Sequence, residues 1–507
     1  MQKSKIIYNS LSAVFQVIVV GIVYIILYKY LLETIGIKLL GVWSLIIATT
    51  SIVLIANFGI STSIVKFVST YHTRKDYQSL KKLIFTAAVF ILVTYCLISL
   101  FIFVIAQKAL PYFIEPDYIQ IALEILPYSL LSLLINAFGG VISSSLDGIQ
   151  KNYIRSYIIT FSSVLLLGLS ILLTPDFGLK GLIFAQIFQA VLILAMSFYY
   201  LNKHISGVFE LKWNWSKPIF REIISYGLKL QVLSFMQMSF EPVTKALLSK
   251  FGGLAMVGYY EMASRLVSQF RSIIVNANQV VIPVIASAKE TNTSYIKNLY
   301  YKSFAIILFL NTIITTVVIL SAPIISKLWI GSFEPVFIFA VVINSLAVFI
   351  NICSNPAYFS YMGEGKLNPL ILSYFFITFL NVSLAFILGY FFGGYGVIVA
   401  WNLAFMLGSL LVVMQYHKST GFKLGEIITR NDMRLLASCM LLAGTAIYLF
   451  YLYISATPVL AWQESDIMRF GLLLLLVETL LVAWFVLKNN NFILLLSEAR
   501  KILMKKQ

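Results

Sequence analysis

Nine charged residues lie inside long apolar stretches of this 507-residue chain, away from the polar segments that hold most of its charge. The basic ones are Lys66, Lys229, Lys245, Arg265 and Arg271, and the acidic ones are Glu124, Glu241, Glu261 and Glu478. At the centre of a helix in a bilayer, each would cost roughly 2.5–3.5 kcal/mol on insertion scales. Residues kept at such a cost usually face a wet cavity or one another, so they are the first candidates for a binding site.

Six of the nine fall within residues 223–286, and their spacing predicts how they pair. Glu241 and Lys245 are four residues apart, and so are Glu261 and Arg265. On a helix, residues at this spacing lie on one face and can form an ion pair. The two glutamates are therefore candidates to position the cations or to carry a coupling ion.

Lys229 and Arg271 have no opposite charge at that spacing, so they are predicted to attract an external anion. A polar stripe also continues along one helical face in steps of three or four residues, and such a stripe cannot face lipid. Its members are Glu261, Arg265, Ser268, Ser272, Asn276 and Gln279. Polar residues at comparable depth nearer the N-terminus are Ser12, Gln16, Asn57 and Ser61. Together they predict a central polar cavity with Arg265, Arg271, Lys229, Lys245 and Lys66 as its cations and Glu124 as a further coupling candidate.

The composition requires elements that cross a membrane. Apolar residues make up 60% of the chain and charged residues 11%, whereas a soluble domain is about one quarter charged. Fourteen runs are long enough for a spanning helix, which needs about 20 apolar residues. They are 6–27, 40–67, 83–106, 119–142, 154–173, 179–201, 223–248, 257–286, 304–325, 336–358, 370–391, 397–414, 435–454 and 470–487. Because the runs are continuous rather than alternating, the predicted fold is an all-α polytopic membrane protein.

The distribution of Lys and Arg predicts the orientation of these spans. One set of alternate connections carries twenty-five of these residues and the opposite set seven. Since cytoplasmic loops carry the basic excess, both termini are predicted to be cytoplasmic. The net charge of +17 then reflects topology, and no nucleic-acid partner is expected. The scattered cysteines and histidines have no metal-ligand spacing, and no phosphate-binding loop motif occurs, so no metal, cofactor or ATPase activity is expected.

The sequence contains an internal duplication. Gly41-Val-Trp-Ser44 aligns with Gly258-Tyr-Tyr-Glu261 at an offset of 217, and Gly181-Leu-Ile-Phe-Ala185 aligns with Gly396-Val-Ile-Val-Ala400 at an offset of 215. Six spans separate equivalent positions, so the copies have the same orientation and are related by an axis along the membrane normal. The predicted parts are a six-helix lobe (1–201), an interfacial linker (202–222), a second six-helix lobe (223–416), a linker (417–434), helices 13 and 14 (435–487) and an amphipathic tail (488–507).

The segments Leu40-Gly-Val-Trp-Ser-Leu-Ile-Ile-Ala-Thr-Thr-Ser51 and Asn57-Phe-Gly-Ile-Ser61 resemble the second span of polysaccharide biosynthesis/export proteins. These are the Wzx-type O-antigen flippases of the multidrug/oligosaccharidyl-lipid/polysaccharide exporter superfamily. The duplicated lobes, the Gly258-Tyr-Tyr motif and the fourteen spans extend the resemblance over the chain.

This resemblance implies a flippase of the bacterial plasma membrane that moves undecaprenyl-diphosphate-linked oligosaccharides outward by alternating access. It implies a cationic cavity lined by the eighth span, which holds Arg265 and Arg271. It also implies a lipid-linked oligosaccharide and membrane lipids as partners, with a proton or sodium as coupling ion and polysaccharide assembly proteins nearby. The cargo would be a precursor of O-antigen, capsule or exopolysaccharide.

Three other classes of membrane protein fit these residues less well. A multidrug/cation antiporter of the same superfamily would need an acidic cavity, whereas spans seven and eight hold four basic and two acidic residues. A membrane enzyme would need a sizeable external loop, and every external connection here is short. A sugar permease of the major facilitator class would carry a Gly-x-x-x-Asp-Arg motif, which residues 70–76 lack. The sequence leaves open the glycan, which is that of O-antigen, capsule, exopolysaccharide, teichoic acid or lipid II, and the coupling, which is to a proton, to sodium or to simple downhill exchange.

Overall fold

The computed structural model describes the chain except at residues 1, 58, 206–213, 279–292, 423, 427, 429, 455–463 and 489–507. The described residues form helices and connections and contain no β-strand. In the first part of the chain the helices are α1 (Gln2–Ser51), η1 (Ile52–Asn57), α2 (Ile60–Thr73), α3 (Tyr77–Ala109), η2 (Leu110–Tyr112), α4 (Pro116–Gly148), α5 (Asn152–Phe177) and α6 (Leu179–His204). The later ones are α7 (Lys217–Asn278), α9 (Thr293–Ile325), η3 (Ser326–Ile330), α10 (Pro335–Glu364), α11 (Asn368–Thr420), η4 (Leu424–Glu426), α12 (Arg430–Ile454) and α13 (Glu464–Lys488).

Local sequence signals set several helix boundaries. The Asp76 side chain accepts a hydrogen bond from the Ser79 amide at 3.0 Å and caps the start of α3. Pro116 occupies the first turn of α4, where its missing amide hydrogen costs nothing. Gly365 and Gly421 adopt left-handed conformations and end α10 and α11.

The chain is a multi-pass membrane protein. In the described part, ten helices are long and apolar enough to cross a membrane. Two of them contain a glycine with non-helical backbone angles: α1 joins the first predicted span to the beginning of the second at Gly36, and α11 joins two predicted spans at Gly393. The 62-residue α7 contains the seventh span and most of the eighth, joined at Gly253. Together with α2, these helices account for the described part of the fourteen predicted spans and confirm the fold class.

The second predicted span, 40–67, is not one continuous helix, and this prediction was wrong. The α-helix ends at Ser51 and continues as the 3-10 helix η1, after which α2 begins at Ile60. Gly59 stands in the left-handed region with φ 67°, a conformation that side-chain-bearing residues rarely adopt. An apolar run predicts burial and length, and it does not reveal a local break of this kind.

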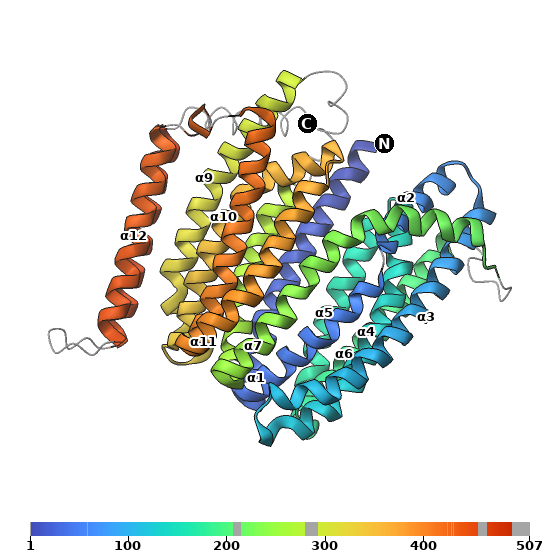
Figure 1. Cartoon of the computed structure of the whole chain (residues 1–507), viewed down its shortest axis with the longest axis horizontal. Coiled ribbons are helices and arrows are strands. Elements are labelled where there is room, and N and C mark those ends of the chain that lie inside the picture. Colours follow the sequence, from blue (N-terminus) through green and yellow to red (C-terminus); the bar gives the residue numbers. More distant parts are fainter. Residues whose placement is uncertain are drawn as a thin grey trace. The chain divides into compact units, whose positions relative to one another are not determined.

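Packing divides the chain into two compact units. Unit 1 comprises Met1–Met262 and Tyr374–Trp401, and unit 2 comprises Ala263–Ser373 and Asn402–Gln507. Within unit 1, α4, α5 and α6 lie side by side (Figure 1). Within unit 2, α9 packs against α10, α12 and α13. Because the units mix segments from both sequence halves, the lobe and linker boundaries stay a prediction.

Equivalent glycines of the two sequence repeats have nearly the same backbone angles in unit 1. Gly36 has φ 80° and ψ 168°, and Gly253, 217 residues later, has φ 80° and ψ 170°. Gly178 and Gly393, 215 residues apart, have φ 56° and 60° with ψ −136° and −147°. The two offsets are those of the sequence repeat, so the copies turn at equivalent residues.

Two glycine-turned hairpins of unit 1, those that turn at Gly36 and at Gly253, approach each other closely and in the same way from both sides. A Cβ built on Gly41 would lie 2.0 Å from the carbonyl oxygen of Leu254, and a Cβ on Gly258 would lie 2.6 Å from that of Ile37. Residues 37 and 41 are each 217 positions before their counterparts 254 and 258. Helix backbones can approach this closely only where a small residue removes the side chain.

Gly41→Ala is expected to lower the melting temperature of the purified protein in detergent. The added methyl would overlap a backbone carbonyl, and such overpacking typically costs about 1–3 kcal/mol. Gly168→Ala in α5 is the control, since its Cβ would meet nothing within 4 Å. A Gly41→Ala protein as stable as the Gly168→Ala protein would show that the hairpins are not in close contact.

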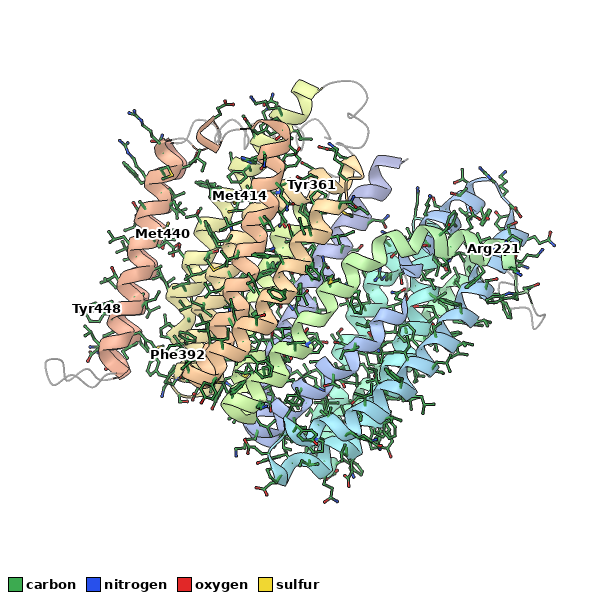
Figure 2. All side chains as sticks on the ribbon, in the orientation of Figure 1. Arg221, Tyr361, Phe392, Met414, Met440 and Tyr448 are labelled. Carbon is green, nitrogen blue, oxygen red and sulfur yellow. The ribbon has the colours of Figure 1, made fainter. Side chains whose placement is uncertain are left out.

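The outward surface of both units is apolar, as lipid contact requires. Figure 2 shows Met440 and Tyr448 on α12 of unit 2, where they are 55% and 60% exposed. Met414 of unit 2 and Phe392 of unit 1 are exposed as well. Apolar surface of this extent is unusual on soluble proteins and normal on membrane spans.

Candidate functional site

A buried charge cluster lies in unit 1 on α7. Lys245 Nζ lies 2.5 Å from Glu241 Oε1 and 2.6 Å from Glu261 Oε2. The side chains of Lys245 and Glu261 are 1% and 3% exposed, whereas that of Glu241 is 55% exposed. The predicted pairing of Glu241 with Lys245 is confirmed, and the structure adds Glu261 as a second partner of the same ammonium group.

Two residues of α1 also donate hydrogen bonds within this cluster, and neither was predicted from the sequence. Tyr28 Oη donates a hydrogen bond to Glu261 Oε1 at 2.6 Å, and Ser44 Oγ donates one to Glu261 Oε2 at 3.0 Å. Ser44 is 217 residues before Glu261, and Tyr28 is 217 residues before Lys245. The repeat offset was therefore the signal that could have identified them.

The cluster satisfies the requirements of buried charge. The ammonium group lies between two carboxylates, and donors from α1 stabilise the more deeply buried carboxylate. A buried ion pair is tolerated only where hydrogen bonds replace the lost water. The charge of Lys245 is compensated within the cluster, and its role toward an external anion stays a prediction.

A second ion pair of unit 1 lies at the connection between α3 and α4. Lys38 Nζ is 2.8 Å from Glu115 Oε2, and the Leu254 amide donates to Glu115 Oε1 at 3.3 Å. Ser249 Oγ also donates to the carbonyl of Phe113. The hydrogen bond from Lys38, with a further contribution from the Leu254 amide, holds the pKa of Glu115 below its usual value of 4.5. These contacts tie the connection to both glycine-turned hairpins.

This pair makes the fold sensitive to acid. Because the pKa of Glu115 is lowered in the folded state, its contribution to stability is present above pH 4.5 and is lost as the pH falls through the folded-state value. We expect Glu115→Gln to be less stable than wild type at pH 7 and the difference to shrink below pH 4.5. Melting curves of both proteins across this range check it. The effect is small because both partners are partly exposed to solvent, and an unchanged difference at low pH would contradict it.

In unit 2, Arg271 is held by a polar layer that joins three helices. Its Nε donates to Asn351 Oδ1 on α10 at 3.0 Å. The Asn351 Nδ2 donates in turn to Ser409 Oγ on α11 at 3.0 Å. Asn351 and Ser409 are buried, at 6% and 2% exposure, and Arg271 is partly buried. The amide of Asn351 is therefore fixed with its oxygen toward the guanidinium.

A second polar layer lies seven residues earlier along the same three helices. Asn344 Nδ2 donates to Ser264 Oγ at 3.2 Å, and Asn402 Nδ2 donates to Asn344 Oδ1 at 2.8 Å. Seven residues are about two helical turns, so the layers are stacked about 10 Å apart. Arg271 was predicted from the sequence as a site residue, whereas Ser264 of α7 and the asparagines of α10 and α11 were missed.

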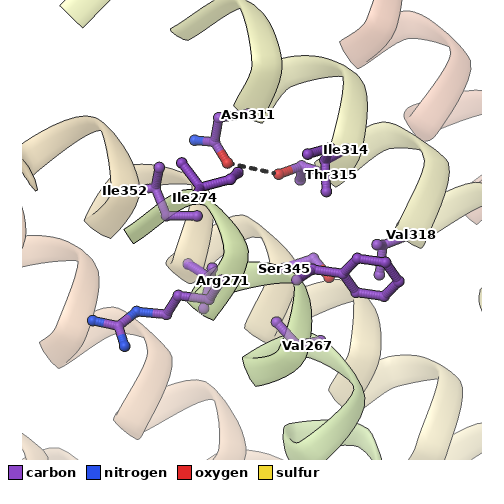
Figure 3. A pocket seen from close by; sticks show the side chains of 11 residues that line it. Val267, Arg271, Ile274, Asn311, Ile314, Thr315, Val318, Ser345 and Ile352 are labelled. Atoms are coloured by element: carbon purple, nitrogen blue, oxygen red, sulfur yellow. Dashed lines mark hydrogen bonds between the residues drawn. The ribbon is translucent and has the colours of Figure 1, made fainter. Parts of the chain in front are cut away.

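Arg271 also borders a pocket of unit 2 formed by α7, α9 and α10. The pocket contains about 240 Å³ of empty space, part of it open to the outside, and is lined mainly by apolar side chains such as Val267, Ile274 and Val318. Figure 3 shows the Arg271 guanidinium pointing away from Val318 and Thr315. A water-sized molecule can enter only about 10 Å³ of this space. Ligand sites usually enclose roughly 300–1,000 Å³, so this pocket is too small for an oligosaccharide.

The other predicted site residues are distributed as follows. Ser268 and Ser272 donate to the Arg265 and Gln269 carbonyls of their own helix, at 2.9 and 2.8 Å. In unit 2, Arg265 is partly buried.

In unit 1, Gln16 and Asn57 are partly buried. Lys66 is exposed and lies over the Phe67 ring, and Glu124 is exposed and lies 2.7 Å from Lys180. Lys229 and Asn276 lie in α7 with side chains outside the described part, and Gln279 lies outside the described residues. The membership of these residues in one cavity stays a prediction.

The sequence matches one protein family. A profile of the polysaccharide biosynthesis protein family matches residues 37–333, more than half of the chain. This range includes Ser44, Glu241, Lys245 and Glu261 of the buried cluster, but not Tyr28, and it includes Arg265 and Arg271 of unit 2. No curated protein matches the sequence.

Solved structures with a similar fold are transporters of the multidrug/oligosaccharidyl-lipid/polysaccharide (MOP) superfamily. An inward-facing multidrug resistance MATE family transporter matches with a TM-score of 0.67 at 16% identity, over 79% of this chain and 94% of that one. The lipid II flippase MurJ in an inward closed conformation matches with a TM-score of 0.65 at 13% identity, over 93% and 98%. A MOP superfamily transporter from Pyrococcus furiosus, whose reverse binding-pocket polarity suggests a different function, matches at 0.59 and 15% identity, over 80% and 95%. At these identities the likeness establishes the fold.

Proposed function

Because the chain belongs to the polysaccharide biosynthesis protein family, we propose that it is a flippase for lipid-linked oligosaccharides. It moves undecaprenyl-diphosphate-linked repeat units across the bacterial plasma membrane by alternating access, for the assembly of O-antigen, capsule or exopolysaccharide. The similar fold of the lipid II flippase MurJ supports this proposal. The chain acts as a transporter and catalyses no reaction.

The observation that carries the proposal is the placement of Arg271. A lipid-linked diphosphate needs cationic donors inside the membrane, and guanidinium groups match phosphate oxygens in geometry and charge. Asn351 binds the Nε edge of Arg271 at 3.0 Å, which orients the planar group. Arg265 lies six residues earlier on α7, and we assign both arginines to the diphosphate, with Lys229 as a further cation.

The coupling ion is assigned to the cluster of unit 1. Glu261 is buried beside Lys245, Tyr28 and Ser44, whereas the side chain of Glu241 is 55% exposed. We therefore assign a coupling proton or sodium ion to Glu241. Release of that ion changes the balance of charge around Lys245 and so couples ion occupancy to the packing of α1 against α7.

The decisive experiment is complementation of a bacterium that lacks its own polysaccharide flippase. Surface glycan and inner-leaflet lipid-linked repeat units are both quantified, and the membrane level of the protein is measured. Restored surface glycan with a falling intermediate supports the proposal. A well-expressed protein that restores no glycan in strains with different repeat units, and that expels a cationic dye, would favour a cation antiporter instead.

A further inference from the structure

Glu478 is a carboxyl group enclosed in the spanning part of unit 2. It lies on α13 and is 1% exposed, and both carboxylate oxygens are buried with no hydrogen-bond partner among the described residues. The neighbouring positions Leu476, Val477 and Leu480 are exposed and apolar. The glutamate therefore points into the unit from a helix whose other face is suited to lipid.

Three helices enclose this carboxyl group. A Cβ on Gly471 of α13 would lie 3.0 Å from Ile324 of α9, and Phe485 of α13 packs in one cluster with Phe309 of α9. Contacts at these two points mean that α13 and α9 are antiparallel and closely packed. Glu478 lies seven residues from each α13 contact, which places it level with the middle of this segment of α9.

The groups that face Glu478 are neutral. From α12, Cys439 lies near enough to interact electrostatically with the carboxyl group, and it packs in one cluster with Phe309 of α9 and Phe485 of α13. Thr316 of α9 donates its proton to the Thr312 carbonyl at 2.9 Å. The other packed side chains on these helices are apolar, namely Phe309, Ile313, Leu435, Leu481 and Phe485. In the described part of α9, α12 and α13, no lysine or arginine forms a salt bridge with Glu478.

An ionised carboxylate in this environment would be strongly unfavourable. Removing a charge from water without a partner costs several kcal/mol even after relaxation, and such a group takes up a proton instead. The neutral acid keeps only the smaller cost of a buried hydroxyl and carbonyl. The α9–α12–α13 packing and a proton on Glu478 therefore stabilise each other.

We propose that Glu478 is a proton-binding site in the membrane interior and that α13 docks against α9 and α12 only while this carboxyl group is protonated. The ligand is a proton, carried as the neutral carboxylic acid. Loss of this proton would place an unpaired charge among apolar side chains and would weaken the docking of α13. The site is independent of the proposed diphosphate ligands, since it lies on different helices and needs no substrate.

Labelling with dicyclohexylcarbodiimide tests the protonated state directly in membranes at neutral pH. This apolar reagent reacts with the acid form: the carboxyl oxygen bonds to the carbodiimide carbon, the proton passes to nitrogen, and rearrangement gives a stable N-acylurea. We expect mass spectrometry to locate the adduct on Glu478 in the wild-type protein. The adduct should be lost in Glu478→Gln and kept in Glu124→Gln, in which an exposed, ion-paired carboxylate is removed.

Two results would overturn the proposal. Absence of the adduct at Glu478, while the reagent labels a known protonated intramembrane carboxyl in the same vesicles, would show that the group is ionised. Protection by sodium at constant pH and ionic strength would assign the site to a metal cation. The melting temperature gives a second readout: Glu478→Gln and Glu478→Leu should be as stable as wild type or more stable, whereas a marked loss in both would indicate a bound cation or partner.

Discussion

Lys245→Met is expected to lower the free energy of unfolding by about 3–5 kcal/mol, because it removes one member of a buried ion pair and leaves the other. Glu261 would remain at 3% side-chain exposure after losing the ammonium group 2.6 Å away, although Tyr28 and Ser44 still donate hydrogen bonds to it. The protein would have to protonate Glu261 or admit water between α1 and α7. Thermal unfolding of the purified protein in detergent measures the loss.

A matched control and a double variant isolate the cause. Lys180→Met removes an ion pair of similar length, 2.7 Å to Glu124, in which both side chains are 42% exposed, so a much smaller loss is expected. Adding Glu261→Gln to Lys245→Met should recover much of the stability, because the stranded charge is gone. Equal melting temperatures for Lys245→Met and Lys180→Met would show that the cluster is hydrated and of little energetic importance.

The combined substitution of Arg265 and Arg271 by alanine is expected to abolish glycan export at normal protein level. Each charged hydrogen-bonding group contributes about 1.5–3 kcal/mol, which corresponds to roughly 10–150-fold in affinity per arginine. Export in the complementation assay, together with the accumulated lipid-linked intermediate, measures the effect.

The geometry around Arg271 adds a graded expectation. Arg271→Lys keeps the positive charge but lacks the Nε donor that Asn351 binds, so it should export at a level between wild type and Arg271→Ala. Arg469→Ala is the control, since Arg469 is 80% exposed and 3.8 Å from Asp466 on the surface of α13. Unchanged export in the double alanine variant would exclude these arginines as diphosphate ligands. Because such a protein would still export glycan, the flippase assignment itself would stand, with other residues as the diphosphate ligands.

Some features of this protein were decided by the sequence alone. Hydrophobic runs predicted the membrane class and the helices, and α5 and α6 begin within two residues of their predicted spans. This succeeds because lipid offers no hydrogen bonds, so an apolar run of sufficient length must form a helix. The pairing of Glu241 with Lys245 was predicted for a similar reason, since helical spacing alone brings these residues together.

The partners of the buried charges were decided only by the tertiary structure. Tyr28 meets Glu261 across 233 residues and Asn351 meets Arg271 across 80, and no local periodicity links such positions. The break between η1 and α2 at Gly59 was likewise hidden within an apolar run. Sequence periodicity shows which residues of one helix become buried, because burial along a helix depends on local spacing. The hydrogen-bond partners that replace water around those residues depend on how separate helices pack, and this arrangement exists only in the folded chain.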